Sequence, residues 1–308
     1  MNSKNWQLSD YPYNNKILNL PDCKSSPKEV FNHHFHSHFS QDFLYSIDNN
    51  YENWENPEQN ERFWFRWITG HQTMFIFWFF LSSELMDIVN TNEVGIIEQK
   101  LNLCRKLFQG CYVLFEYAGS CSVDFYSSNT RPWMALFHKG FSGKWSSDYQ
   151  LIPRLVDHII KSHYPEELKT SQKAFKQAFI ESQKNHYGIA KRLIPSSGSL
   201  SKEFKDALSA SEITKEQRNL YDYFFLVKRS SQPEYPLFLS LSDRIKAIIL
   251  DLTLNGLHPE ILSDADDSQW REKQLSKYQE ETPQDILFKT ATALYFVEYS
   301  AQLIPIEN

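Results

Sequence analysis

From Trp64 to Leu81 the chain reads WFRWITGHQTMFIFWFFL, with His71 near its middle. Nearly every neighbour of this histidine is aromatic or aliphatic, so a helix over this stretch would be apolar on nearly all faces and would lie in the core. A buried imidazole needs a hydrogen bond, a substrate or a cofactor, because burying it unpaired costs free energy. His71 is therefore the first candidate for chemistry.

The composition indicates one globular domain with a large core. At 308 residues the chain can bury that core without disulfides or a structural metal. Its aromatic content of 15% is more than an aliphatic core needs and suits a pocket for a flat ligand. The formal net charge of -6 and the lack of a dense Lys/Arg stripe argue against a nucleic-acid partner.

The lack of a recognisable signal peptide and the spacing of the cysteines favour a cytoplasmic protein. The amino terminus lacks the apolar stretch of a signal peptide, and the four cysteines have no CxxC spacing, as is typical of reduced thiols. The apolar run around His71 is shorter than the roughly 20 residues that span a bilayer. It also carries Arg66 and Gln72. We therefore expect a buried helix and no membrane association.

The sequence divides into an N-terminal arm, residues 1–60, and a helical domain, residues 61–308. The arm is rich in Asn, Ser, Asp and Pro, which predicts an irregular or partly helical segment. In the domain, helical spacing of apolar residues predicts helices over 61–90, 93–117, 151–163, 166–193, 242–254 and 283–302. No strand-like alternation is sustained and no repeat is present, so the predicted fold class is all-α, a single-domain helical bundle.

Residues 120–148 differ from the helical segments around them. They are dense in Gly, Ser, Pro and aromatic residues, and Gly119 is expected to end the helix before them. A long segment of this kind inside a compact protein often carries function.

His186 is the second candidate histidine. At 100° per residue it falls on one stripe of its helix with Phe175, Phe179, Ser182, Ile189 and Leu193. A histidine on such a stripe is more often a core residue bonded to a carbonyl than a ligand. Two inward imidazoles on separate helices would also suit a flat macrocycle, with one ligating iron and the other facing the open coordination site. The residues alone leave both interpretations open.

Two other features are candidates for binding. His33, His34, His36 and His38 could bind Zn²⁺ or Ni²⁺, but no Cys or acidic ligand completes a known spacing, and we favour a solvated loop. Arg131 stands among aromatic residues. It could hold a substrate carboxylate bidentately, or it could form an ion pair that fixes its loop.

The two histidine segments together resemble the tryptophan 2,3-dioxygenases. Residues 67–73, WITGHQT, with Phe77-Trp78-Phe79 and Glu84-Leu85 after them, are similar to the helix that carries the distal histidine of that family. Residues 186–194, HYGIAKRLI, and the Ser/Gly loop that follows are similar to its haem-ligating segment. In that segment too, an arginine lies six residues after the histidine. The order of the two segments matches the histidine-ligated haem aromatic oxygenases.

Three segments in the middle of the chain indicate which group of these haem enzymes the sequence resembles most. YAGSC at 117–121, RPWM at 131–134 and FSGKWSSDY at 141–149 look like the bacterial haem-dependent L-tyrosine hydroxylases of antibiotic pathways. The resemblance covers about residues 63–199 and implies hydroxylation of L-tyrosine to L-DOPA with hydrogen peroxide. The chain departs from the dioxygenases at Gly70, where they have Thr, and at Trp67, where they have a substrate-contacting Phe. These departures put tryptophan cleavage in doubt.

The resemblance also implies a role for each residue of the site. Haem b would be held by His186 as the axial ligand of the iron, with Trp67 and Arg192 as further cofactor contacts. His71 would be the distal catalytic group.

On the substrate side, the resemblance implies that an aromatic amino acid would contact Arg131, Phe75, Ser197, Gly198 and Ser199. One alternative is a haem-dependent dioxygenase or monooxygenase that acts on tryptophan or another indole, with dioxygen in place of peroxide. Another, from a different class, is a non-enzymatic helical binding protein whose aromatic residues only build the core. A homo-oligomer is compatible with each of these functions.

Overall fold

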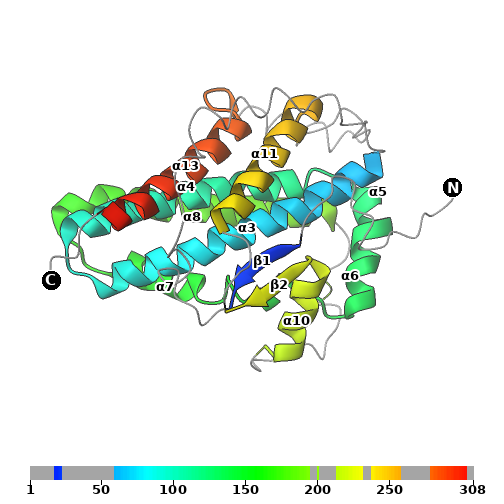
Figure 1. The fold of residues 1–308 in the computed structure, drawn as a ribbon, viewed down its shortest axis with the longest axis horizontal. Helices are drawn as coiled ribbons and strands as arrows, with labels where there is room; N and C mark the ends of the chain where they lie inside the picture. The colour runs from blue at the N-terminus through cyan, green and yellow to red at the C-terminus, as the bar shows by residue number, and fades with distance from the viewer. Residues whose placement is uncertain are drawn as a thin grey trace.

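A computed structural model describes residues 17–22, 59–194, 200, 213–231, 237–257 and 278–303. The described elements are mainly helices, which confirms the predicted all-α fold class (Figure 1). The longest helices are α3 (Gln59–Asn90), α4 (Val94–Ala118), α8 (Glu166–Leu193), α11 (Leu237–Asn255) and α13 (Pro283–Leu303). A shorter helix, α7 (Ile152–Lys161), lies between α4 and α8 in the chain. The predicted helices agree with these bounds, apart from α11, which begins before the predicted Ser242.

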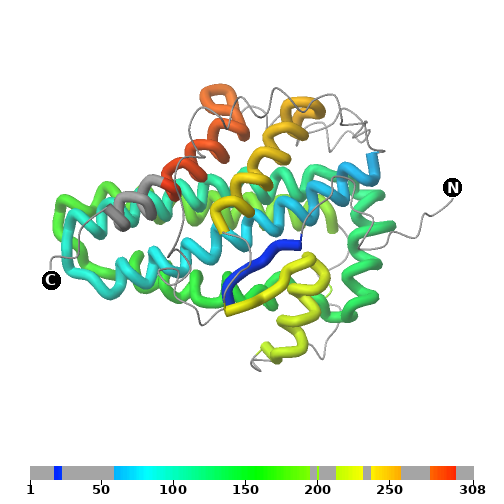
Figure 2. Tube along the Cα trace, in the orientation of Figure 1, coloured from blue at the N-terminus to red at the C-terminus, as the bar shows by residue number. Residues whose placement is uncertain are grey.

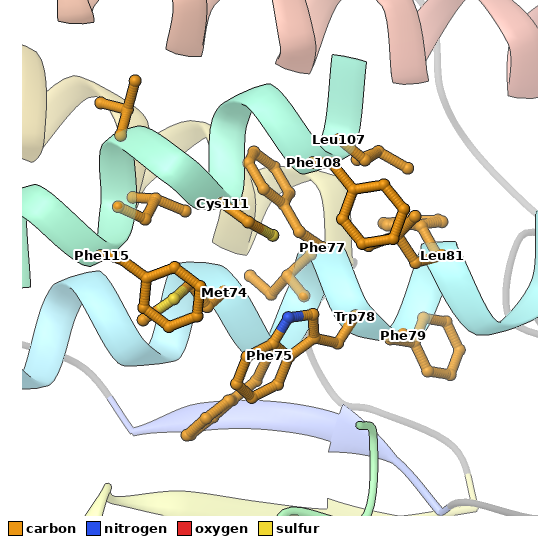
Figure 3. Packing of buried hydrophobic residues seen from close by; sticks show 14 of the residues in the cluster. Met74, Phe75, Phe77, Trp78, Phe79, Leu81, Leu107, Phe108, Cys111 and Phe115 are labelled. Carbon is orange, nitrogen blue, oxygen red and sulfur yellow. The ribbon is translucent and has the colours of Figure 1, made fainter. Parts of the chain in front are cut away.

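α3 is the core helix of the molecule. Its side chains between Phe63 and Leu81 are nearly all buried, because α4, α7 and α11 pack around it. Figure 3 shows Phe108, Cys111 and Phe115 extending from α4 toward α3, while Phe75 extends from the opposite side of α3, toward the strands. The aromatic density of the opening stretch is thus explained by packing on more than one side of the helix.

Length and composition alone would also let α3 cross a membrane. Among the described residues it is the one helix that meets this criterion. Inside the protein, 72% of its most apolar window is buried by other parts of the chain. The apolar character of α3 is therefore accounted for by its place in the core.

Two glycines let α4 lie close to both of its neighbours. A Cβ added to Gly70 of α3 would come within 3.0 Å of the Cβ of Ala118, at the end of α4. A Cβ added to Gly119, which ends α4 as predicted, would lie 2.4 Å from Cγ2 of Ile189 on α8. Both α3 and α8 therefore approach α4 closely around its C-terminal end.

Short helices occupy much of the segment 120–148. They are α5 (Val123–Phe125), a π-helical turn (Tyr126–Thr130), α6 (Arg131–Phe137) and a 3-10 turn (Gly143–Trp145). The side chain of Ser122 accepts a hydrogen bond from the backbone N–H of Phe125 and so caps the first of them. These elements are too short to show a helical period in the sequence.

A helix and two strands complete the fold. Thr214 and Gln217 form a capping box that starts α10 (Lys215–Phe224), and the sequence carries this T-x-x-Q signal. β1 (Leu18–Pro21) pairs in parallel with β2 (Val227–Ser230), and Figure 2 shows the two strands side by side. These two short strands were not predicted from the sequence. Strands of four residues show too little alternation to be recognised in a sequence.

We expect that replacing Gly119 with Ala destabilises the protein by about 1–3 kcal/mol, because the new methyl group would overlap Ile189. The matched control is Gly188→Ala, which lies within α8 with nothing inside 4 Å of the added Cβ. This control should instead stabilise by about 0.4–1 kcal/mol. Chemical denaturation of both variants measures the two changes. Equal stabilities for the two alanine variants would contradict the close contact.

Candidate functional site

A cavity of about 420 Å³ lies beside the C-terminal end of α4. Small-molecule sites typically enclose roughly 300–1,000 Å³. Aromatic side chains from several parts of the fold line it: Trp67, Trp78, Phe115, Tyr126, Phe141, Tyr149, Tyr221 and Phe225. Aliphatic residues and glycines also belong to the wall, and its histidines and other polar side chains are His71, His186, Arg131, Ser142, Lys144 and Gln183.

His71 is held in one tautomer by the backbone of its own helix. Its Nδ1 lies 2.6 Å from the carbonyl oxygen of Trp67. A carbonyl only accepts, so Nδ1 carries the proton and Nε2 carries the lone pair. Burial lowers the pKa of His71 to about 4; the backbone hydrogen bond opposes this shift, and a charge on His186 would add to it. His71 is therefore neutral at pH 7, with Nε2 able to accept a hydrogen bond.

His186 faces the same cavity from α8. Its ring stacks on Phe115, with 4.4 Å between ring centroids and 14° between the planes. His186 is exposed to solvent, and desolvation by the protein around its imidazole lowers its pKa. Within the described ranges no residue forms a hydrogen bond to its ring nitrogens. A neutral imidazole with a free lone pair is what a metal ion requires of histidine.

Two side chains fasten α8 to α4 on either side of this histidine. Asn185 Nδ2 donates to the carbonyl oxygen of Tyr112 over 2.9 Å. Arg192 Nη2 donates to the carbonyl oxygen of Cys121 over 3.0 Å and also to that of Gly119. Arg192 thereby satisfies carbonyl groups at the end of α4, and it is not among the residues that line the cavity. Its predicted contact with a cofactor stays a prediction.

A series of hydrogen bonds through two buried polar side chains holds the ring of Phe225 over His71. The two rings stack with 4.6 Å between centroids and 23° between planes. Gln72, fully buried beside His71, donates from Nε2 to the carbonyl oxygen of Phe225 over 2.8 Å. Its Oε1 accepts from Nε of Arg244 over 2.9 Å, and Arg244 also donates to the carbonyl of Ser240. Side chains of α3 and α11 together thus determine what covers His71.

Arg131 and Lys144 bring positive charge to the cavity wall. Arg131 donates a hydrogen bond to the hydroxyl of Tyr126. Burial raises the pKa of Tyr126 to about 12, although the guanidinium opposes this shift. Lys144 is exposed on its 3-10 turn. No aspartate or glutamate belongs to the described part of this wall, so a ligand that carries a carboxylate is favoured there.

Four residues chosen from the sequence line this one cavity: Trp67, His71, Arg131 and His186. Phe75 does not line it but lies behind Phe225, with 5.2 Å between their ring centroids. The loop residues 197–199 and the histidines of 33–38 lie outside the described residues. In the part of the chain that is described, no group of three or more His, Cys, Asp or Glu could hold a metal ion.

Several lining residues escaped the sequence analysis. Gln183 stands outside the stripe through His186, yet it lines the cavity and forms a hydrogen bond with Tyr149. Its spacing of three residues from the histidine was a usable signal, because such residues share a helix face. Tyr221 and Phe225 come from the end of α10. No local pattern in the sequence connects them with the cavity.

Residues 42–178, just under half of the chain, match the family model described as SfmD 3-methyl-L-tyrosine peroxygenase. The matched stretch contains Trp67, His71 and Arg131 and ends before His186. No curated protein matches the chain. The part of the candidate site that residues 42–178 supply is therefore similar to a family of peroxygenases.

The lowered pKa of His71 predicts how the stability of the cofactor-free protein depends on pH. In the unfolded chain a histidine binds a proton near pH 6.5, whereas folded His71 binds one only near pH 4. Between these values the unfolded state holds more protons, so the free energy of unfolding falls as the pH falls. His71→Gln should flatten this part of the profile in denaturant titrations at a series of pH values.

His158→Gln removes an exposed imidazole on α7 and controls for the loss of a histidine as such. If His71→Gln kept the full wild-type slope between pH 6.5 and pH 4, the buried neutral state of His71 would be wrong.

Proposed function

We propose that this protein is a haem-dependent peroxygenase that hydroxylates the aromatic ring of a tyrosine-type amino acid. The observation that carries the proposal is that His71 of α3 and His186 of α8, both with lowered pKa values, open on one aromatic cavity. The similarity of residues 42–178 to 3-methyl-L-tyrosine peroxygenases supports both the oxidant and the phenolic substrate. In its specific form the proposal is conversion of L-tyrosine to L-DOPA.

The proposed reaction balances without an external reductant. One oxygen atom of hydrogen peroxide is inserted into a ring C–H bond, which becomes C–O–H. The second oxygen leaves as water with the two peroxide protons. The protein therefore needs to hold the phenol, exclude bulk water and place the ring carbon beside the oxidant.

The donor chemistry of the cavity fits a haem. His186 would hold the haem iron through its free lone pair, and α4 fixes the position of the helix that carries this histidine. Nε1 of Trp67 is buried and has no hydrogen-bond partner among the described residues, so it could donate to a bound group. Lys144 could balance the charge of a propionate. When bound, haem b would supply the oxidising power.

The low pKa of His71 defines what this residue can do for a phenol. With a pKa of about 4 it does not remove the proton of a phenol, whose pKa is about 10, in the resting complex. Nε2 can instead accept a hydrogen bond from the phenol hydroxyl and so orient the ring. Trp67 Nε1–H and the stacked Phe225 restrict the directions from which the substrate enters. His71 is therefore proposed as the distal group that positions the substrate and can take a proton as the reaction proceeds.

The cationic wall suits the carboxylate of an amino acid. Arg131 can bind a carboxylate bidentately, and its bond to Tyr126 restrains the guanidinium. Ser197, Gly198 and Ser199 remain proposed partners of the amino and carboxylate groups, and Phe75 supports the aromatic wall from behind.

Replacing the two histidines should have different effects on haem binding and turnover. His186→Ala is expected to lose bound haem, because it removes the axial ligand. His71→Ala is expected to keep haem but to lose turnover with L-tyrosine and peroxide by about 10²–10⁴-fold. Haem absorbance and product formation measure the two effects, and His158→Ala serves as a control on an exposed histidine. The reverse pattern would exchange the two roles, and protein that takes up no haem would refute the proposal.

Arg131→Met should raise the KM for L-tyrosine by about 10–100-fold, the loss expected for one charge-assisted carboxylate contact. Tyramine, which lacks the carboxylate, should be used equally poorly by wild type and variant. Arg154→Met, on the exposed side of α7, is the matched control. An unchanged KM in Arg131→Met would show that the carboxylate is bound elsewhere.

A panel of L-tyrosine, 3-methyl-L-tyrosine and L-tryptophan, with peroxide and with dioxygen, identifies the substrate.

A further inference from the structure

We propose that Arg229 is a positioning residue that clamps the Asp148-Tyr149 turn to the last helical turn of α10, Tyr221-Asp222, and so fixes the two tyrosines on the cavity wall. Each turn pairs an aspartate that binds Arg229 with a tyrosine that lines the cavity. The consequence for substrate rests on the proposed function, whereas the clamp itself does not.

The guanidinium of Arg229 uses all five of its N–H groups. Nη1 and Nη2 donate to the two carboxylate oxygens of Asp148 over 2.8 and 2.7 Å. Nε and Nη2 donate to the two oxygens of Asp222, each over 3.0 Å. Nη1 also donates to the carbonyl oxygen of Pro21 over 3.4 Å. One side chain of β2 therefore joins β1, α10 and the turn before α7.

Because these side chains are buried, removing the Arg229 guanidinium would leave two carboxylates without a counter-charge. The side chains of Arg229, Asp148 and Asp222 are 14%, 2% and 12% exposed. Burial raises the pKa of Asp222 even though the guanidinium opposes it. A buried ion pair seldom adds stability over apolar residues of the same size, but removing one partner leaves an uncompensated charge. What Arg229 contributes here is a fixed geometry between two turns.

The first turn places Tyr149 on the cavity wall. Besides the clamp on its side chain, Asp148 is held through its carbonyl oxygen, which accepts a hydrogen bond from Ser82 Oγ over 3.0 Å. Tyr149 packs on Trp78, with 4.9 Å between ring centroids, and its hydroxyl pairs with Gln183 of α8. The Asp148 turn thus determines where Tyr149 meets the helix that carries His186.

The last turn of α10 supports Phe225, the ring that stacks on His71. Tyr221 stacks on Phe141, with 5.4 Å between ring centroids, and lies 4.9 Å from Phe225, the ring over His71. Directly after Phe225, Leu226 has a positive φ of 55°. A bulky residue adopts this strained conformation only where the surrounding structure imposes it. The clamp on α10 and β2 holds both ends of this strained corner.

Without Arg229, two buried carboxylates would face each other uncompensated and the two turns would separate. The wall formed by Tyr149 and Tyr221 would then lose its fixed position. The histidines are held by separate contacts, namely the backbone bond of His71 and the anchors of α8 to α4. We therefore expect weaker substrate binding with little change in the chemical step.

The decisive comparison is Arg229→Met against Lys100→Met. Lys100 is also a half-buried cation between two carboxylates, 2.8 Å from Glu84 and 2.9 Å from Asp87, but it does not touch the cavity. In hydrogen exchange, Arg229→Met should accelerate the amides of residues 146–152 and 219–228 at least about tenfold, with α4 unchanged. Lys100→Met should leave both turns as in wild type. Exchange that is unchanged in the turns of Arg229→Met, or raised equally in α4, would overturn the clamp.

The functional readout separates the clamp from the proposed activity. In haem-loaded protein, Arg229→Met should raise the KM for L-tyrosine at least about tenfold while kcat stays within about threefold and haem content is unchanged. A loss of kcat at constant KM would overturn the positioning role. If Arg229→Met does not fold, Asp148→Asn and Asp222→Asn supply the same test, because each weakens one side of the clamp. Wild type that neither binds haem nor uses L-tyrosine would refute the proposed function, while hydrogen exchange would still decide the clamp.

Discussion

The close approach of three helices around the end of α4 is the constraint on which the rest of this structure depends. Gly70 lets α3 reach Ala118, and Gly119 lets α8 reach the same end of α4 through Ile189. Packed interiors leave no room for an extra methyl group at such contacts. Because α3 carries His71 and α8 carries His186, the contacts of α4 with both helices set the relation between the two imidazoles.

Apolar packing brings the helices together, but polar side chains determine the shape of the cavity. Gln72 fixes Phe225, Arg192 and Asn185 fix α8, and Arg229 joins two turns. Each of these bonds reaches a specific backbone or carboxylate oxygen, so it allows one arrangement where hydrophobic contact would allow several. The walls of the cavity are consequently specified more narrowly than the core beneath them.

The electrostatics of the cavity combine neutral histidines with a cationic wall. Desolvation lowers the pKa values of both imidazoles, which favours the neutral form and leaves each ring able to offer a lone pair. Arg131 and Lys144 remain charged beside them, without a carboxylate in the described part of the wall. This distribution favours a ligand that combines a negative charge with an apolar, aromatic part.

The sequence by itself determined the helices, the core position of α3 and the two histidines, because helical periodicity and an isolated imidazole in an apolar run are local signals. It also singled out Trp67 and Arg131, through their aromatic surroundings and a family resemblance. Only the tertiary structure decided that Tyr221 and Phe225 complete the wall, that Arg229 joins the segments beside it and that Phe75 stands behind it. It also decided that β1 pairs with β2 and buries Leu18 and Leu20. Contacts between residues so far apart in the chain follow from packing geometry, which no short stretch of sequence encodes.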